Sequence, residues 1–370
     1  MYDDIKKLGF GLMRLPKTPD GKEDIEKVAE MVDLALSNGY KYFDTAYVYD
    51  NGLSEKCVKE VLTKRYDRKE FYVATKLPSW EMKEKADRQR IFDEQLERTG
   101  LEYFDFYLLH AIEKDSLPIY DDLDAWTFCE EKKRQGLIKN FGFSFHDTAE
   151  VLDEILSKHE DVDFVQLQLN YIDWEHESIQ SRLCYETARK HGKKIIVMEP
   201  VKGGLLANIN SDAADVFGEF DKNTSPAAKA LRFVGTLDGV LTVLSGMSTL
   251  DQMKENIATF ESLSPLTSDE RAIYARVAEK LLSIKSIPCT ACKYCVDGCP
   301  KKISIPTMFR LFNDSVAFPN DSLNKGKYAY TTSELGAKAS DCISCGKCES
   351  VCPQKLHIRE LLKEVAEKFE

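Results

Sequence analysis

Eight of the eleven cysteines in this chain of 370 residues are confined to two short runs that share one spacing, Cys-x2-Cys-x2-Cys-x3-Cys-Pro. The first run contains Cys289, Cys292, Cys295 and Cys299, and the second contains Cys342, Cys345, Cys348 and Cys352. Crowding of this kind argues for metal ligands rather than for a disulfide framework, whose cysteines are scattered over a small secreted chain. We therefore expect the end of the chain to fold around metal.

The spacing also indicates how the metal is held. It resembles the run of dicluster ferredoxin modules, in which three closely spaced thiolates bind one [4Fe-4S] cluster and the fourth binds the other. We expect two [4Fe-4S] clusters with crossed ligation. One is expected on Cys289, Cys292, Cys295 and Cys352, and the other on Cys342, Cys345, Cys348 and Cys299. Zinc is the alternative metal, but two such runs do not divide naturally into tetrahedral sites made of Cys-x2-Cys pairs.

Up to about residue 260 the chain has a different pattern, in which short β-branched or aromatic runs alternate with longer amphipathic stretches. Eight such alternations in roughly 250 residues fit a (β/α)8 TIM barrel better than an open doubly wound sheet. No G-x-G-x-x-G follows the first strand. The expected strands are residues 8–12, 42–46, 71–77, 104–110, 138–145, 164–170, 194–200 and 241–247. The fold class is therefore α/β, with a barrel over residues 1–275 and a small dicluster ferredoxin-like domain over residues 276–370.

Helical periodicity fills the spaces between these strands. The helices expected most clearly are residues 24–37, 54–65, 147–158, 225–234, 268–286, 305–312 and 358–370. In the fourth of these, Ser225 stands at the cap position and Pro226 at the first helical position, where proline is favoured. The other three cysteines, Cys57, Cys129 and Cys184, lie singly in helical sequence and are expected to be buried thiols.

The formal net charge of −11 argues against binding to nucleic acid or to an anionic membrane, which requires a concentrated excess of Lys and Arg. The chain starts with polar and acidic residues where an export signal would be basic and then apolar. No apolar run approaches the roughly 18 residues that a bilayer requires. We therefore expect a cytoplasmic protein that acts on a small molecule, without a nucleic-acid or membrane partner.

Four polar residues stand at or just after the ends of consecutive expected strands, which is where the chemistry of a TIM barrel is found. Asp44 and Tyr49 lie in Phe-Asp-Thr-Ala-Tyr-Val-Tyr, Lys76 lies in Val-Ala-Thr-Lys-Leu, and His110 ends Tyr-Leu-Leu-His. These segments, in this order, resemble those of the aldo-keto reductase family. The resemblance covers nearly all of residues 1–260.

The resemblance implies an oxidoreductase that reduces an aldehyde or ketone with NADPH or NADH, or oxidises an alcohol in the reverse direction. Hydride transfer to a carbonyl leaves an alkoxide that needs a proton, and a phenol with a pKa near 10 is a poor donor unless a cation stabilises its phenolate. We expect Tyr49 to donate this proton and Lys76, held by Asp44, to supply the cation. His110 would orient or polarise the carbonyl.

The resemblance also implies which residues contact the nicotinamide end of the cofactor. Ser144 and Gln166 are expected at the carboxamide, because an amide needs a donor and an acceptor at fixed geometry. Gly203 and Gly204 follow the seventh strand and would let the backbone approach the pyrophosphate.

The segment after the eighth strand resembles the adenosine-binding segment of the family. Its expected contacts are Gly246, Ser248, Gln252, Glu255 and Asn256. In much of the family the positions matching Gly246 and Gln252 are basic and bind the 2′-phosphate of NADPH. This chain has no cation at either position, so the choice between NADPH and NADH stays open.

The clusters need a role of their own. Hydride transfer moves two electrons, whereas a [4Fe-4S] cluster passes one, so electron exchange between nicotinamide and cluster requires a converter such as flavin. Flavin is therefore a further candidate cofactor, although no flavin motif is visible. The clusters would relay electrons to or from an external electron carrier, regulate the barrel in response to redox state, or have a structural role. Electron relay is favoured, because a structural role needs only one cluster. The competing hypothesis is a redox-sensing or electron-transfer protein whose barrel binds a nicotinamide but turns over little carbonyl.

Overall fold

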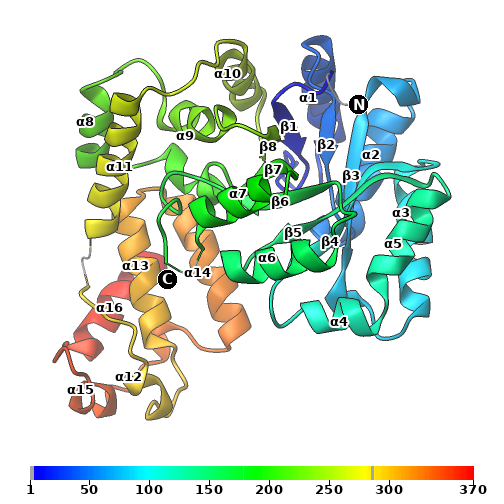
Figure 1. Cartoon of the computed structure of the whole chain (residues 1–370). Coiled ribbons are helices and arrows are strands. Elements are labelled where there is room, and N and C mark those ends of the chain that lie inside the picture. Colours follow the sequence, from blue (N-terminus) through cyan, green and yellow to red (C-terminus); the bar gives the residue numbers. More distant parts are fainter. Residues whose placement is uncertain (1–3, 178, 285–286) are drawn as a thin grey trace. The chain divides into compact units, whose positions relative to one another are not determined.

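A computed structural model describes residues 4–177, 179–284 and 287–370. Within them, eight parallel strands close into a barrel in the order of the chain (Figure 1). The strands are β1 Leu8–Gly11, β2 Tyr42–Asp44, β3 Tyr72–Pro78, β4 Phe104–Ile112, β5 Ile138–Phe145, β6 Phe164–Gln168, β7 Lys194–Met198 and β8 Val240–Ser245. Each lies where the sequence predicts a strand, so the predicted α/β barrel is confirmed.

The barrel interior is filled by side chains from alternate strands. Tyr42, Phe106 and Phe164 form part of one buried cluster, with ring centroids 4.9 Å apart for the first pair and 5.3 Å apart for the second. Gly142 makes room for this packing, because a Cβ there would lie 2.3 Å from the carbonyl oxygen of Phe164. The interior is therefore a packed core that supports functional residues at the strand ends.

Helices connect and surround the strands (Figure 1). In the barrel part they are α1 Ile25–Ser37, α2 Leu53–Val58, α3 Ala86–Thr99, α4 Leu117–Asp122, α5 Ala125–Arg134, α6 Ala149–Lys158, α7 Ser181–Lys190, α9 Pro226–Gly235 and α10 Leu250–Glu261. Asp24 caps α1 by accepting a hydrogen bond from the backbone N–H of Lys27, and Pro226 begins α9, as the sequence predicts. The helix expected at 54–65 is α2 continued by a π-helical turn, Lys59–Thr63.

The chain divides into two compact units. One comprises Met1–Val201 and Ala228–Leu266, and the other comprises Lys202–Ala227 and Thr267–Glu370. The segment that leads from β7 toward α9 is thus grouped with the C-terminal part of the chain. The sequence boundary between residues 275 and 276 stays a prediction.

The second unit is helical. Its helices are α8 Ser211–Gly218, α11 Ser268–Ser283, α12 Tyr294–Asp297, α13 Ile305–Ala317, α14 Asp321–Leu335, α15 Lys347–Ser350 and α16 Ile358–Phe369. Its core joins α13 to α16 and includes Met308, Phe309 and Val365, each fully buried. α13 extends beyond the expected residues 305–312. α11 covers most of the stretch expected at 268–286, of which residues 285 and 286 lie outside the described residues.

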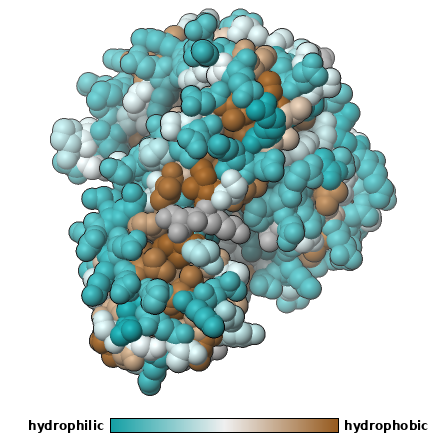
Figure 2. All heavy atoms as spheres, turned by 90° about the vertical axis from the view of Figure 1, so that its left-hand side faces the viewer, coloured by the Kyte–Doolittle hydropathy of each residue, from teal (hydrophilic) through white to brown (hydrophobic). Residues whose placement is uncertain are grey.

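Figure 2 shows a face of the molecule that is mostly hydrophilic, as expected of a chain in which 31% of the residues are charged. None of the described helices has the length and apolarity that a membrane-spanning helix requires. Cys57, Cys129 and Cys184 are buried, which confirms the expectation for the cysteines outside the two runs.

Candidate functional site

A buried ion pair joins the ends of β2 and β3. Asp44 is the last residue of β2, and Lys76 lies near the end of β3. The Lys76 Nζ donates to Asp44 Oδ1 at 2.6 Å and to the carbonyl oxygen of Thr45 at 2.7 Å. Only 1% of the Lys76 side chain and 3% of the Asp44 side chain are exposed. Because a buried charge without its partner is costly, each side chain fixes the other in place.

The third member of this group is Tyr49, whose hydroxyl oxygen lies 3.3 Å from Lys76 Nζ. Tyr49 begins a tight turn in which Asp50, Asn51 and Gly52 have φ values of 47°, 53° and 82°. These left-handed residues reverse the chain, so that α2 begins directly after Gly52. The turn thereby brings the phenol back over the Lys76 ammonium.

His110 lies on β4 beside the same group. Its ring centroid is 5.9 Å from that of Tyr49 and 5.1 Å from that of Trp80, a side chain that is 51% exposed. Burial, with the charges of Lys76 and His146, lowers the pKa of His110 well below its usual range. The imidazole is therefore neutral and carries one N–H donor, as a group that orients a carbonyl requires.

The shifted pKa values of Tyr49, Asp44 and Lys76 indicate which of these groups carry a proton at rest. Burial raises the pKa of Tyr49, the Lys76 ammonium opposes this, and Asp44 adds to it. Burial also raises the pKa of Asp44 against the effect of Lys76. For Lys76 burial favours the neutral amine, but Asp44 and Tyr49 outweigh it and the pKa lies above its usual value. The resting site thus holds a protonated phenol next to an ammonium.

Ser144 and Gln166 are direct neighbours across β5 and β6 and are 1% and 2% exposed. Ser144 Oγ accepts the N–H of Ala111 at 2.7 Å, and Gln166 Nε2 lies 3.6 Å from Met198 Sδ. Gln166 Oε1 has no hydrogen-bond partner among the described residues. An orphaned buried acceptor is costly. The pair therefore fits the carboxamide of a nicotinamide, whose NH2 group would supply the missing donor.

The two glycines after β7 have left-handed backbones. Gly203 and Gly204 have φ values of 65° and 94° within a short 3-10 segment, Lys202–Ala207. A Cβ at Gly204 would lie 3.6 Å from Leu323 of α14, in the same compact unit. Their backbone conformation suits glycine, while their contact with the pyrophosphate stays a prediction.

The predicted adenosine segment is tied together by its own hydrogen bonds. Asn256 Nδ2 donates to Ser245 Oγ at 3.0 Å and is 5% exposed, so this amide faces the end of β8. Gln252 Oε1 accepts the N–H of Ser248 at 2.7 Å, whereas Glu255 is exposed. The segment therefore offers an ordered turn at the start of α10.

Arg14 is a functional candidate that the sequence reasoning missed. Its Nη1 lies 3.7 Å from the position that a Cβ of Gly246 would take, and its carbonyl oxygen accepts the Ser248 hydroxyl at 2.7 Å. The guanidinium of Arg14 thus lies near residue 246, which is a glycine and carries no cation of its own. Its place just after β1 is the available signal, because strand ends carry the function of a barrel.

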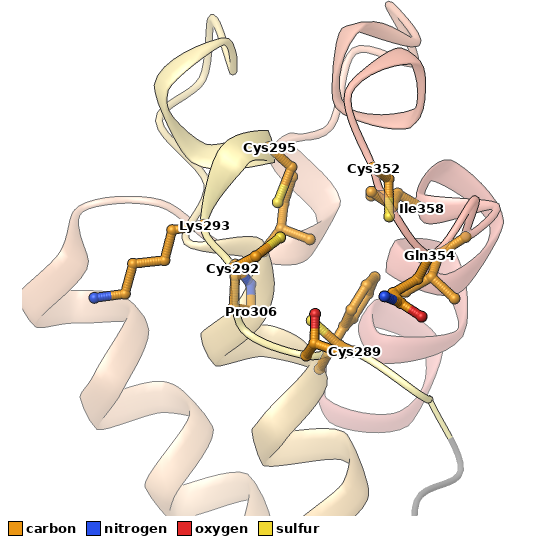
Figure 3. A pocket seen from close by; sticks show the side chains of 12 residues that line it. Cys289, Cys292, Lys293, Cys295, Pro306, Cys352, Gln354 and Ile358 are labelled. Carbon is orange, nitrogen blue, oxygen red and sulfur yellow. The ribbon is translucent and has the colours of Figure 1, made fainter.

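The cysteines line two cavities in the second unit, each with about 320 Å³ of empty space that is partly open to solvent. The first is lined by Cys289, Cys292, Cys295 and Cys352, and the second by Cys299, Cys342, Cys345 and Cys348. Figure 3 shows the four sulfurs of the first cavity turned toward a common space. The last cysteine of each run thus lines the cavity of the other run, which is the arrangement that crossed ligation requires.

The two cavities do not have the geometry of single-ion sites. Among the described residues, no three His, Cys, Asp or Glu side chains come close enough to hold one metal ion. A zinc site would draw four sulfurs to about 2.3 Å from one point. The sulfurs instead surround a space, so the donor set suits a cluster better than an ion.

The two cysteine runs repeat one backbone pattern that the sequence reasoning did not identify. Two residues after the first cysteine of each run, Ala291 and Ser344 have φ values of 56° and 55°. Two residues further on, Lys293 and Gly346 have φ values of 66° and 76°. Left-handed residues in a turn direct successive N–H groups inward, which favours a negatively charged centre such as a thiolate-bound cluster.

Comparison with known proteins assigns the two parts of the chain to two different families. Residues 7–279 match the model of the aldo/keto reductase family, and residues 288–357 match the model of a 4Fe-4S dicluster domain. The first match spans most of the chain and includes the buried ion pair, Tyr49 and His110.

Individual relatives cover the barrel part. Methylglyoxal reductase DkgA of Escherichia coli is 28% identical over 244 residues, which are 64% of this chain and 80% of the relative. An aldo-keto reductase from Bacillus halodurans, in its holo form, has a TM-score of 0.61 and 26% identity, and the match covers 74% of this chain and 92% of that one. A Klebsiella pneumoniae aldo-keto reductase in complex with NADPH has a TM-score of 0.58 at 18% identity, covering 74% and 91%, and shows the fold alone.

Proposed function

The chain belongs to the aldo/keto reductase family of NAD(P)H-dependent oxidoreductases, and from this premise we propose that it reduces a small aldehyde or ketone, or oxidises the alcohol in the reverse direction. The observation that carries the proposal is the buried contact of 3.3 Å between Lys76 Nζ and the Tyr49 hydroxyl oxygen. A phenol that is protonated at rest and faces an ammonium has the two properties a proton donor to an alkoxide needs.

The residues of the site have separate roles in this reaction. A nicotinamide held by Ser144 and Gln166 would supply or accept the hydride. Tyr49 gives its proton to the substrate oxygen, and Lys76 stabilises the phenolate that remains. Neutral His110 donates a hydrogen bond to the same oxygen and fixes the carbonyl relative to the phenol. Trp80, whose ring centroid lies 5.1 Å from that of His110, is proposed to form one wall of the substrate site.

Ser144 and Gln166 are proposed to hold the carboxamide of the nicotinamide. The support is the unpartnered Oε1 of buried Gln166, with Ser144 beside it in the β5–β6 register. NADPH and NADH are both proposed as cofactors, because the segment after β8 lacks a cation at positions 246 and 252.

The substrate class follows from chemistry and from one relative. The E. coli relative is named a methylglyoxal reductase, and methylglyoxal is a small carbonyl compound of the kind the site can protonate. We therefore propose methylglyoxal and simple aldehydes as the first substrates to test. The partner is a small molecule, in keeping with the net charge of −11.

The two cysteine-lined cavities are proposed to hold two [4Fe-4S] clusters with crossed ligation, which pass single electrons when present. Relay to or from an external electron carrier is proposed as their role. To test it, NADPH, NADH and dithionite are added in turn to anaerobic protein, and the cluster absorbance is followed. Bleaching by a nicotinamide supports an electron path from the barrel, which would then require a flavin or another converter. Bleaching by dithionite but by neither nicotinamide would contradict an electron path from the barrel to the clusters.

The reductase proposal is tested by turnover with two matched variants of anaerobically purified, cluster-loaded protein. Tyr49→Phe removes only the hydroxyl proposed to donate the proton and should lower kcat by about 100-fold or more. Tyr47→Phe is the control, because its hydroxyl donates to Glu94 at 2.7 Å and is not among the groups proposed to touch the substrate. Full activity in Tyr49→Phe would show that another group is the donor. Absence of turnover in the wild type with every carbonyl tested would favour the redox-sensing alternative.

A further inference from the structure

A buried polar network lies next to Lys76 but outside the group proposed to touch substrate. Its central members, Glu55 of α2, Thr75 of β3 and Gln95 of α3, are all fully buried. Glu55 Oε1 accepts the Thr75 hydroxyl at 2.7 Å and the Gln95 amide at 3.0 Å. Gln95 Oε1 in turn accepts the Tyr107 hydroxyl at 2.6 Å. Four elements, α2, β3, α3 and β4, are thus tied together by hydrogen bonds between buried side chains.

The network reaches the backbone of Lys76 through Gln95. The β2–β3 ladder ends where the N–H of Thr45 donates to the carbonyl of Ala74 at 2.8 Å. In a parallel pair the next carbonyl on that edge belongs to the residue two positions on, which is Lys76. With β2 ended, this carbonyl accepts Gln95 Nε2 at 3.0 Å. Gln95 therefore replaces the missing strand at the residue that carries the ammonium.

A second arm of the network reaches the turn that carries Tyr49. Arg98 Nη1 donates to Glu55 Oε2 at 3.3 Å and to the carbonyl oxygen of Tyr47 at 3.1 Å. The guanidinium carbon lies 4.1 Å from the centroid of the Tyr47 ring. A Cβ at Gly52 would lie 2.8 Å from the same Nη1. Arg98 thus contacts the chain on both sides of Tyr49.

Glu55 joins the two arms, because its two carboxyl oxygens accept hydrogen bonds from both. Burial raises the pKa of Glu55, and hydrogen bonds from Thr75, Gln95 and Arg98 oppose this. An apolar core would be simpler at this position, since a partly satisfied buried network is costly. The network also holds two backbone carbonyls, those of Lys76 and Tyr47, and this gives a reason for a polar core here.

We infer that Gln95 and Arg98, joined through Glu55, are positioning residues that set the distance between Lys76 and Tyr49. For its kinetic consequence the inference rests on the proposed function, in which Lys76 stabilises the phenolate of Tyr49. Catalytic contacts lose rate steeply when displaced by about 1 Å. Loss of either arm lets the ammonium and the phenol separate, and the phenolate loses its cation.

The test removes the network at its most conservative point. Thr75→Val replaces the hydroxyl by a methyl group of nearly the same size, and Thr75→Ser retains the hydroxyl. Gln95→Leu removes the amide that holds Lys76. Tyr49 is titrated by tyrosinate absorbance as the difference from the same variant that also carries Tyr49→Phe. We expect the pKa of Tyr49 to rise in Thr75→Val and Gln95→Leu and to return to the wild-type value in Thr75→Ser.

Turnover provides the second readout. Thr75→Val and Gln95→Leu should lower kcat by about ten-fold with little change in KM, because the substrate contacts stay in place. The pH limb of alcohol oxidation should move upward with the pKa of Tyr49. The titration needs no turnover, so it judges the inference even if the wild type reduces none of the carbonyls offered, a result that would count against the proposed function alone.

A matched control separates positioning from stability. Asn140 is a buried amide that donates to the carbonyl of Asp105 at 2.7 Å. Both residues lie near the starts of their strands, β5 and β4, whereas the site lies at the strand ends. Asn140→Leu should lower thermal stability as Gln95→Leu does, without moving the pKa of Tyr49. If Gln95→Leu and Thr75→Val lose stability but leave the pKa of Tyr49 and the pH profile unchanged, the network is structural and the inference is wrong.

Discussion

Cys299 and Cys342 line one cavity, although the first belongs to the earlier cysteine run and the second begins the later run. The same crossing brings Cys352 into the cavity of the first run. Both fourth cysteines directly precede a proline, and both are only partly exposed. Each cluster proposed for these cavities would therefore depend on both runs, and so would the fold of the unit around them.

Crossed ligation can be separated from ligation within each run by pairs of cysteine variants. The wild type with two clusters contains about eight iron atoms per chain. Crossed ligation predicts that Cys299→Ala combined with Cys345→Ala damages one site only and leaves about four of them. Cys299→Ala combined with Cys292→Ala damages both sites and should leave almost none. Ligation within each run predicts the reverse.

The control for these variants is Cys57→Ala, a buried thiol of α2 outside both runs. It should retain the full iron content. Iron and sulfide analysis with electron paramagnetic resonance of the dithionite-reduced protein provides the measurement. Equal iron loss in the two double variants would contradict both ligation schemes.

The pH dependence of turnover should contain one limb from Tyr49 and none from His110. Burial, with the Lys76 charge, holds the pKa of His110 well below its usual range, so no inflection is expected near pH 6.5. Burial raises the pKa of Tyr49, so carbonyl reduction, which needs the protonated phenol, should fall only above about pH 10. Alcohol oxidation needs the phenolate and should therefore gain rate as the pH rises.

Lys76→Met sharpens this prediction. It removes the cation that opposes the effect of burial, so the oxidation limb should move to still higher pH. The measurement is kcat against pH in both directions. An inflection near pH 6.5 that disappears in His110→Gln would show instead that the imidazole ionises during turnover.

Local pattern was sufficient for the barrel, because each strand and helix carries its own periodicity. The β-branched and aromatic runs at β3 and β5 are bounded by polar turns, and α9 begins at its proline. The grouping of Lys202–Ala227 with the C-terminal part depends on contacts far along the chain, such as Asn210 N–H to the carbonyl of Ala317 at 3.2 Å. No local pattern encodes such a pairing.

The same distinction applies to the site. Asp44, Tyr49 and Lys76 could be predicted together because parallel strand ends meet at one edge, so order along the chain is enough. Gln95 could not, because its contact with the Lys76 carbonyl exists only where β2 stops one pair short. In sequence it is one polar residue of an amphipathic helix. Its role becomes visible only from the burial and the hydrogen bonds of the folded chain.

Gly142 should tolerate no side chain, in contrast to a glycine exposed on a helix. Gly142→Ala would place a Cβ 2.3 Å from the carbonyl oxygen of Phe164 and should cost about 3 kcal/mol through overpacking. Gly326 lies inside α14, and apart from its own helix backbone and chain neighbours no described atom lies within 4 Å of its Cβ position, so Gly326→Ala should stabilise α14 by about 1 kcal/mol. Thermal unfolding of each variant checks the pair. A Gly142→Ala barrel as stable as the wild type would contradict the packing described for β5 and β6.

Arg14 should decide between the two nicotinamide cofactors. Its Nη1 lies 3.7 Å from the Cβ position of Gly246, where the family resemblance leads us to expect a cation for the 2′-phosphate, and 46% of its side chain is exposed. Arg14 Nη2 lies 3.8 Å from Glu199 Oε1, so this partly exposed ion pair is weak and leaves donors for a phosphate. Arg14→Ala should therefore lower kcat/KM for NADPH about ten-fold more than for NADH. Lys22→Ala removes an exposed cation from the same loop after β1 and should leave the ratio unchanged. An equal loss for both cofactors would instead assign Arg14 to the pyrophosphate that they share, because only the 2′-phosphate distinguishes them.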